Sequence, residues 1–393
     1  MNIGIYQVYW GRVGGGQRYI GAVAEVLSQR YPVEFVHHCQ TMSITYLEEA
    51  LELDLSKVNF RYIPRKEHPV WETNNPLKRL REEKQWYEEI SEPYDLFIDN
   101  SDSIPFFCHA KRGVLVTHFP LVTFEEFHGH TTEGWEKQPL VTKMAKNLFH
   151  RFEWKRRFST YDLCLASSRF CSQWMKRLWD LDAEVVYPPI RNGLCPQKKE
   201  NLILSISAFD SSQHKKHEIN LETFKTLCRQ NLTDWKYIMV GAVDSSAESR
   251  AYLERLRNVS KGYAVEIYSN VSGLELKSLL ERASLLWHAM GYGVDEKKEP
   301  RLMEHFGMVV AEAMATGCIP IVFDGGGLRE IVSHGQNGFL WSNLDDLRNY
   351  TLTLIRDVNL RHNLSNTAVE TSKKFSRKVF ESRLLEALAP VLE

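Results

Sequence analysis

Short apolar runs alternate along the chain with longer segments whose apolar residues recur at helical spacing. The first such helical segment places Ile20, Val23, Ala24 and Leu27 on one face. This alternation predicts an α/β fold built on doubly wound parallel sheets. Buried strands are expected at residues 3–8, 33–38, 60–63, 95–99, 113–117, 162–166, 185–189, 202–206, 237–241, 265–268, 284–290 and 319–323.

The alternation is interrupted once, at 190–200, by a segment with proline, glycine and several basic residues. A chain of 393 residues also exceeds what one hydrophobic core usually serves. We therefore expect two domains, at residues 1–192 and 200–375, that are joined by this linker. Residues 376–393 are expected to form a final helix.

The stretch from Glu304 to Gly327 carries the main candidate site. It predicts a loop, a short helix that ends at Gly317, a buried strand and a glycine loop. The free N–H groups and the dipole at the start of the helix favour phosphate. These groups belong to Phe306, Gly307, Met308 and Val309.

Two carboxylates flank the helix start: Glu304 precedes the helix, and Glu312 is expected in its third turn. They would lie roughly 10 Å apart along the axis, too far to share one proton or one metal ion. They suit opposite ends of an elongated ligand with a charged middle, such as a nucleotide-sugar. The competing interpretation is that Glu304 is an exposed loop acid and Glu312 a solvated helix residue.

Two features of the first half also point to a ligand. A glycine loop follows the first strand, and its Gly15 and Gly16 would let a diphosphate or an acceptor approach the backbone, although such glycines also serve packing alone. His118 follows the strand at 113–117 and precedes Pro120, so it lies at the carboxyl end of a central strand. Its competing interpretation is a buried histidine bonded to a carbonyl.

The spacing Glu304-x7-Glu312 within EHFGMVVAEAMATGCIPIVFDGGGLREIV resembles the signature of family 4 retaining GT-B glycosyltransferases. Within that family, the chain is most similar to mannosyltransferases that extend a lipid-linked oligosaccharide and to their bacterial relatives. The resemblance covers the second half strongly and the first half patchily. It implies two Rossmann-like domains that face a cleft, with the acceptor on the first, the nucleotide-sugar on the second, and a last helix at 376–393 that crosses back to the first.

The resemblance also implies roles for individual residues. Glu304 would lie by the donor sugar, Glu312 would hold the ribose hydroxyls, and the amides at 306–309 would bind sugar or phosphate. His118 would line the cleft near the donor hexose, since the resembled enzymes carry a histidine-aromatic-proline sequence there. Lys215 would hold the donor diphosphate.

One departure from the family stands beside that lysine. Ala208 occupies the place of an arginine that would also hold the diphosphate. Lys216, Arg329 or no residue at all would supply the missing charge. The departure leaves open a non-catalytic subunit that binds nucleotide-sugar. An epimerase or a glycan phosphorylase of similar architecture is a less favoured alternative, because the spacing Glu304-x7-Glu312 is not typical of either class.

The implied reaction is the transfer of a hexose, with mannose favoured and GDP-mannose as first choice of donor, to a glycan or lipid-linked acceptor hydroxyl. The acceptor would attack from the leaving-group side, and the departing diphosphate would take its proton. Neither a cofactor nor a metal ion is then expected. The D-x-D sequence of Asp180 and Asp182 is interpreted as a turn between a helix and a strand.

Composition narrows the class of protein further. A net charge of −1 argues against a general nucleic-acid binder. Seven cysteines without any C-x-x-C pair favour reduced thiols in a cytoplasmic protein over a disulfide framework or a zinc site. The amino terminus predicts a strand and not a signal peptide, and no apolar run is long enough to predict a membrane-spanning helix.

A basic segment suggests contact with a membrane. Residues 137–179 carry ten lysines and arginines and two acids, a local net charge of +8. Four apolar residues at helical spacing would let the helix present one apolar and one cationic face to an anionic bilayer, with Lys155, Arg156 and Arg157 among the contacts. The competing interpretation is a helix packed on its domain with solvated lysines. The first interpretation predicts peripheral contact at the inner face of the membrane through residues 137–157. The four apolar residues are Leu140, Met144, Leu148 and Phe152.

Overall fold

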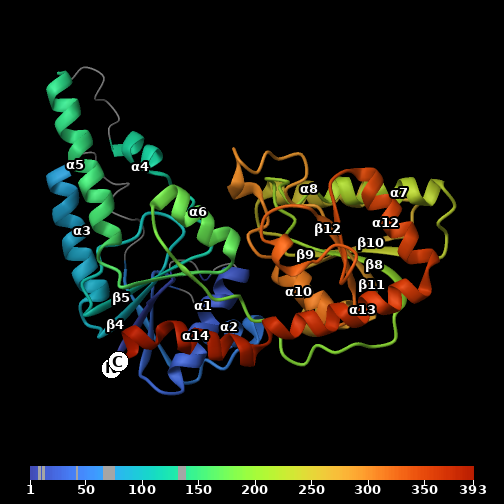
Figure 1. Ribbon diagram of the computed structural model, residues 1–393, viewed down its shortest axis with the longest axis horizontal. Helices are drawn as coiled ribbons and strands as arrows, with labels where there is room; N and C mark the ends of the chain where they lie inside the picture. The colour runs from blue at the N-terminus through green and yellow to red at the C-terminus, as the bar shows by residue number, and fades with distance from the viewer. Residues whose placement is uncertain (8–9, 11–13, 41–42, 65–75, 132–138) are drawn as a thin grey trace. The chain divides into compact units, whose positions relative to one another are not determined.

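The chain folds into two compact units, of which the first comprises Met1–Pro188 and Phe380–Glu393 and the second Pro189–Val379 (Figure 1). The predicted linker thus lies at the start of the second unit. The structure is a computed structural model. It describes residues 1–7, 10, 14–40, 43–64, 76–131 and 139–393.

The first unit is built on a parallel sheet of seven strands in the order β3-β2-β1-β4-β5-β6-β7. The chain leaves β1 toward one edge of the sheet and returns to its other side at β4, which makes this pair a topological switch point. Ligands bind at the carboxyl ends of strands at such points. The strands are β1 (Ile3–Tyr6), β2 (Val33–His37), β3 (Val58–Tyr62), β4 (Leu96–Asn100), β5 (Arg112–Thr117), β6 (Leu163–Ala166) and β7 (Glu184–Val185).

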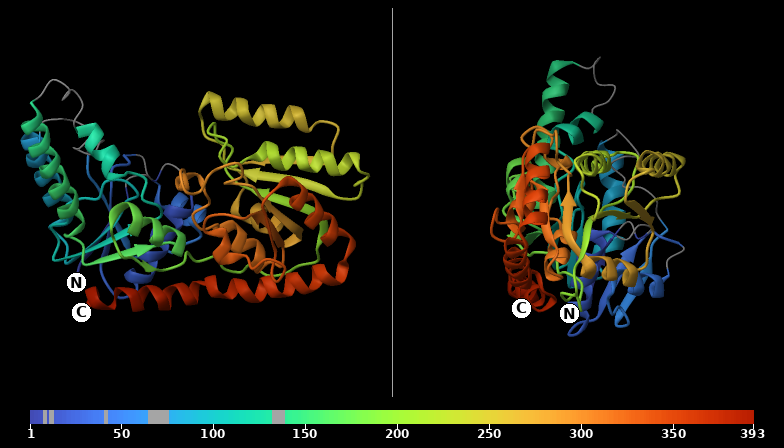
Figure 2. Two further views of the ribbon diagram at one scale, coloured as in Figure 1. Left: turned by 45° about the horizontal axis from the view of Figure 1, so that its top comes forward. Right: turned by 90° about the vertical axis from the view of Figure 1, so that its right-hand side faces the viewer.

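The core of the first unit joins both ends of the chain. Ile5 of β1 and Ile20 of α1 are fully buried in one cluster with Leu384 and Leu388 of α14. The last helix therefore completes this core, although the second unit precedes it in the sequence (Figure 2). The helices are α1 (Gly15–Ser28), α2 (Ile44–Leu51), α3 (Pro76–Ser91), α4 (Phe124–Thr131), α5 (Leu140–Phe158), α6 (Arg169–Trp179) and α14 (Arg377–Leu392).

The second unit repeats the design with a parallel sheet of six strands in the order β10-β9-β8-β11-β12-β13. Its strands are β8 (Glu200–Ile206), β9 (Lys236–Gly241), β10 (Val265–Ser269), β11 (Ala283–His288), β12 (Ile319–Phe323) and β13 (Phe339–Trp341). Its α-helices are α7 (His217–Arg229), α8 (Ala247–Ser260), α9 (Gly273–Arg282), α10 (Met308–Ala315), α11 (Leu328–Ile331), α12 (Leu344–Arg356) and α13 (Val358–Ser372). Two short 3₁₀ helices are η3 (Pro300–Leu302) and η4 (Lys373–Phe375).

Both sheets confirm the predicted doubly wound α/β fold, and most strands lie close to their predicted ranges. The strand predicted at 185–189 is shorter because Pro188 and Pro189 have no N–H for a ladder. β13 was not predicted, since three residues carry too little periodicity. Val8, the predicted end of the first strand, lies outside the described residues.

The basic helix α5 differs from the sequence expectation. The four apolar residues predicted for its lipid face, among them Met144 and Leu148, face outward and are largely exposed, so the packed-helix interpretation does not hold for them. Arg157 is wrongly placed among the membrane contacts, because its side chain is fully buried and ion-paired with Glu83 and Glu153. Lys137 lies outside the described residues. No helix in the described part of the chain is long and apolar enough to cross a membrane.

Candidate functional site

The candidate site in the second unit begins at a sharp turn before α10. Gly307 has φ 103, and a Cβ there would lie 2.7 Å from the Leu328 side chain, so only glycine fits this left-handed position. The helix therefore begins at Met308, and Glu312 lies in its second turn and not in the third. The main-chain N–H groups of Met308 and Val309 are at the start of α10, where the helix dipole favours an anion.

Glu304 lies in a cluster of three charged or polar side chains. Its Oε2 lies 3.0 Å from Lys215 Nζ and 3.1 Å from His288 Nε2. Lys215 comes from the loop before α7 and His288 is the last residue of β11, so the cluster forms at the carboxyl edge of the sheet. The structure thus brings together two predicted residues, Lys215 and Glu304, and adds His288, which the sequence analysis missed.

The environment of Glu304 decides its ionisation. Its side chain is 18% exposed, so the interpretation as an exposed loop acid is wrong. Burial alone would raise the pKa of Glu304, but the Lys215 ammonium and the His288 hydrogen bond outweigh burial and hold this pKa well below its ordinary value. Glu304 is therefore a carboxylate at neutral pH. It can accept hydrogen bonds and stabilise positive charge, but it has no proton to donate.

The glycine loop after β12 holds the main chain of the Glu304 segment. The Gly327 N–H donates to the Glu304 carbonyl at 2.8 Å. A Cβ on Gly326 would lie 2.3 Å from that carbonyl oxygen, and a Cβ on Gly327 would lie 2.2 Å from the carbonyl oxygen of His305. These glycines therefore allow two loops of the same unit to approach each other closely.

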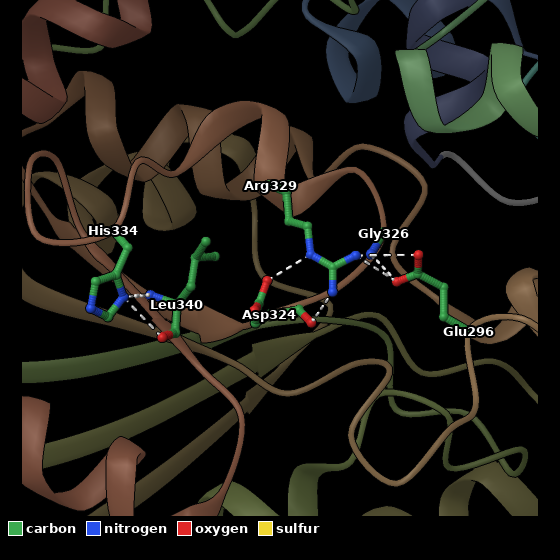
Figure 3. A network of polar contacts seen from close by, with 6 residues as sticks. All are labelled: Glu296, Asp324, Gly326, Arg329, His334 and Leu340. Atoms are coloured by element: carbon green, nitrogen blue, oxygen red, sulfur yellow. Dashed lines mark hydrogen bonds and ion pairs between the residues drawn. The ribbon is translucent and has the colours of Figure 1, made fainter.

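Arg329 was one candidate for the charge missing at Ala208. Figure 3 shows its guanidinium between two carboxylates: Nε lies 2.6 Å from Asp324 Oδ1, and NH1 lies 2.9 Å from Glu296 Oε2. Glu296 also accepts from the Gly326 N–H at 3.1 Å, which ties the polar loop before the Glu304 segment to the glycine loop. Arg329 is thus already neutralised by two acids.

Glu312 is buried, with 3% of its side chain exposed, so the solvated-residue interpretation is wrong. Its Oε1 lies 3.3 Å from Arg191 Nε and 3.4 Å from the Arg191 main-chain nitrogen. Arg191 belongs to the segment that the sequence predicts as a linker. No pattern in the sequence marks it as a partner of Glu312.

Two predicted residues of the first unit lie together. A Cβ on Gly16 would lie 3.2 Å from His118 Nε2, so the first turn of α1 packs against this imidazole. His118 Nε2 is buried and has no hydrogen-bond partner among the described residues, and Asp102 Oδ1 accepts from the His118 main-chain N–H at 2.6 Å. The carbonyl-bonded interpretation of His118 therefore finds no support in the described residues. Gly15 is the first residue of α1, whereas residues 11–13 of the glycine loop lie outside the described part.

The D-x-D sequence forms the predicted turn. Asp180 adopts a left-handed conformation after α6, and both Asp180 and Asp182 contact Lys176 Nζ, at 3.2 and 3.0 Å. Within the described ranges, no group of three or more histidine, cysteine or acidic side chains is placed to hold a metal ion.

A sequence profile of the family described as "Glycosyl transferases group 1" matches residues 188–371. This range contains the whole cluster around Glu304 as well as Glu312 and Arg191. Residues 188–371 are a group 1 glycosyltransferase domain. Its matched range agrees closely with the second unit, Pro189–Val379.

Five curated relatives of this chain share one name, GDP-Man:Man(3)GlcNAc(2)-PP-Dol alpha-1,2-mannosyltransferase. The Dictyostelium discoideum protein is 29% identical over 55% of this chain and 44% of its own length. The human protein is 22% identical over 99% of this chain and 86% of its own length. The matches to the Dictyostelium and two Xenopus proteins span only about half of those relatives, 44 to 50%.

Solved structures similar to this chain share its fold along nearly the whole length. Anabaena HepE in complex with UDP and glucose has a TM-score of 0.67 at 16% identity and covers 98% of this chain and 99% of its own. WaaG, a glycosyltransferase involved in lipopolysaccharide biosynthesis, has a TM-score of 0.64 at 12% identity, with 98% and 99% covered. The predicted GT-B fold class, with two Rossmann-like domains, is thereby confirmed.

Proposed function

We propose that this protein is a retaining glycosyltransferase that moves a hexose, mannose by preference, from a nucleotide diphosphate sugar to a hydroxyl of a glycan or lipid-linked acceptor. The observation that carries the proposal is the Lys215–Glu304–His288 cluster at the carboxyl edge of the sheet in the group 1 glycosyltransferase domain. The names of the curated relatives support GDP-mannose as donor and a dolichol-linked oligosaccharide as acceptor.

The donor would bind with its diphosphate at the start of α10 and near Lys215. Lys215 Nζ contacts Glu304 Oε2 at 3.0 Å and Met290 Sδ at 2.9 Å. The ammonium thus stands where it can shift from Glu304 toward the leaving phosphate. The carboxylate of Glu304 would then face the donor sugar, where positive charge develops at the transition state.

In the proposed step the bond between sugar C1 and the diphosphate oxygen breaks, and a bond from C1 to the acceptor oxygen forms on the same face. The acceptor's proton passes to the departing diphosphate. Lys215 and the α10 amides would stabilise the leaving charge, and Glu312 would hold the ribose. We propose that the step requires neither a metal ion nor another cofactor.

A second candidate is a non-catalytic subunit that binds nucleotide-sugar. One observation favours it: Ala208 removes a cation and Arg329 is already paired with two carboxylates, which leaves the diphosphate fewer positive partners. Hydrolysis of donor without acceptor separates the candidates. Slow release of sugar by the wild type, absent from Glu304→Gln, would exclude the non-catalytic subunit.

The expected result for the donor is thermal stabilisation by a single class of nucleotide-sugar, GDP-mannose first. A ligand at a hundredfold excess over its Kd stabilises the folded state by about 2.7 kcal/mol. Melting temperatures with GDP-mannose, UDP-glucose, GDP and UDP would measure this, with Glu312→Gln as the variant that should respond less. The donor site is disproved when no nucleotide-sugar and no free nucleoside diphosphate shifts the wild-type melting temperature.

A lipid-linked acceptor would require the enzyme to work at a membrane surface, and we propose the cytoplasmic side. The cysteines support that side: all seven lie among the described residues and none forms a disulfide. Of the predicted contacts, Lys155 and Arg156 remain part of this proposal and Arg157 does not.

A further inference from the structure

The strongest surface feature outside the candidate site is an apolar ridge on α5. The ridge residues are separated mostly by four positions, and each side chain is 63 to 78% exposed. The opposite face of the same helix is buried, with His150, Glu153 and Arg157 inside the unit. Figure 1 shows α5 beside α3, with its amino-terminal end extending past that helix. The ridge consists of Leu140, Val141, Met144, Leu148 and Phe152.

The ridge is unusual on this surface. Among the described residues, fifteen large hydrophobic side chains are exposed, and five of them belong to this one helix. Single exposed apolar residues are normal, but a contiguous exposed stripe marks an interaction surface. One face of α5 is buried in the unit, and the apolar stripe on its other face can be removed from water only by a second apolar surface.

Charge around the ridge identifies the partner. Lys155 and Arg156 follow the ridge on the exposed side of α5, and they make no ion pair within the described ranges. The one acid of this helix, Glu153, is buried and already bound to Arg157. The outward side of α5 thus combines apolar side chains with unneutralised cations, the combination that binds an anionic lipid surface. A second copy on the same face would bring these cations near one another.

We infer that the apolar ridge of α5 inserts into an anionic lipid bilayer while Lys155 and Arg156 contact the headgroups. The inference does not depend on transfer activity. It replaces the predicted arrangement of separate apolar and cationic faces, because the structure places both on one side of the helix.

The test is co-sedimentation of the full chain with vesicles of phosphatidylcholine alone or mixed with phosphatidylglycerol, at low and high salt. The wild type should bind the mixed vesicles, and salt should weaken binding. Lys155→Glu with Arg156→Glu should weaken it at least about thirtyfold, since each surface cation contributes about fivefold and each reversal adds repulsion. Met144→Gln, Leu148→Gln and Phe152→Gln together should abolish it.

The matched control carries Leu274→Gln and Val358→Gln, which remove two isolated apolar residues that are 82 and 61% exposed in the second unit. This control should bind like the wild type. Wild type that stays in the supernatant with mixed vesicles at low salt would overturn the inference. So would a ridge variant that still sediments like the control, or a concentration-dependent dimer that the ridge variant abolishes while vesicle binding is unchanged.

A separate observation concerns His288, and it rests on the proposed function. This side chain is 5% exposed, and its Nδ1 is buried without a hydrogen-bond partner among the described residues. Glu304 is ionised and can only accept a hydrogen bond. His288 Nε2 therefore carries a hydrogen and donates a hydrogen bond to Glu304 Oε2 at 3.1 Å. Among the described residues, the two partners of the carboxylate, Lys215 and His288, contact Oε2 and not Oε1.

We propose that His288 is a positioning residue that holds Oε2 so that Oε1 of Glu304 faces the donor sugar. Lys215 would turn toward the diphosphate when the donor binds, and His288 would then be the contact that keeps the carboxylate in place. His288 thus contacts Glu304 directly, and Lys215 contacts the same oxygen of Glu304.

His288→Leu removes the N–H that donates to Glu304 and should lower kcat by about ten- to a hundredfold, by analogy with the hydrogen-bond partners that orient metal ligands. The Kd of GDP, measured by calorimetry, should stay within about twofold, and His288→Gln should restore much of kcat because its amide can replace the N–H. A His288→Leu enzyme with wild-type kcat, or one that loses GDP affinity as much as kcat, would refute the role. Absence of donor turnover in the wild type would instead refute the proposed function.

Discussion

Arg157→Ala is expected to destabilise the protein by about 3 to 5 kcal/mol, the cost of breaking a buried ion pair from one side. The Arg157 guanidinium lies 2.8 Å from Glu83 and 2.5 Å from Glu153, and all three side chains are at most 2% exposed. It also lies 4.6 Å from the centre of the Phe107 ring. Its removal would leave two buried carboxylates without their shared cation.

Urea unfolding of Arg157→Ala and of its neighbour variant Arg156→Ala would measure this effect. Arg156 is exposed, so its variant should change the free energy of unfolding by no more than about 0.5 kcal/mol. Equal stability of the two variants would contradict the role of Arg157. A membrane-binding test must therefore leave Arg157 unchanged, because lost vesicle binding by a destabilised variant would not identify a membrane contact.

The second large effect is the loss of turnover expected for Glu304→Gln, about a hundred- to a thousandfold in kcat. The substitution keeps the shape of the side chain and removes the negative charge that, in the proposed function, faces the donor sugar. It also leaves the Lys215 ammonium without its ion-pair partner, so that Lys215 becomes more available to a diphosphate. The affinity for free GDP should therefore stay unchanged or rise.

Glu312 should behave in the opposite way. Glu312→Gln should weaken GDP by roughly 1.5 to 3 kcal/mol, the cost of losing a charged hydrogen bond to the ribose. Glutamine is preferable to alanine here, because its amide oxygen can still accept a hydrogen bond from Arg191, whose Nε lies 3.3 Å from Glu312 Oε1. Calorimetry with GDP and initial rates with GDP-mannose would separate the two glutamates. Equal losses of GDP affinity in Glu304→Gln and Glu312→Gln would contradict their placement.

The alternation of strands and helices could be predicted from the sequence because parallel strands are buried on both faces and appear as continuous apolar runs. β12 is such a run, and Gly317, with φ 78, adopts the left-handed conformation directly after the C-cap of α10, as predicted for the end of that helix. The motif around Glu304 could be found for the same local reason: its loop, helix and strand are contiguous.

Only the tertiary structure decided which side chains meet. Lys215 and Glu304 are 89 positions apart, and Arg191 and Glu312 are 121 apart, so no periodicity relates the members of either pair. His288 ends a strand like many others, and its importance appears only when the Glu304 loop lies against it. The sequence of α5 alone determined that it is amphipathic and basic. Which of its faces is buried depended on the rest of the unit, because Arg157 forms a buried ion pair with Glu83 of α3 and the apolar ridge lies on the opposite, exposed face.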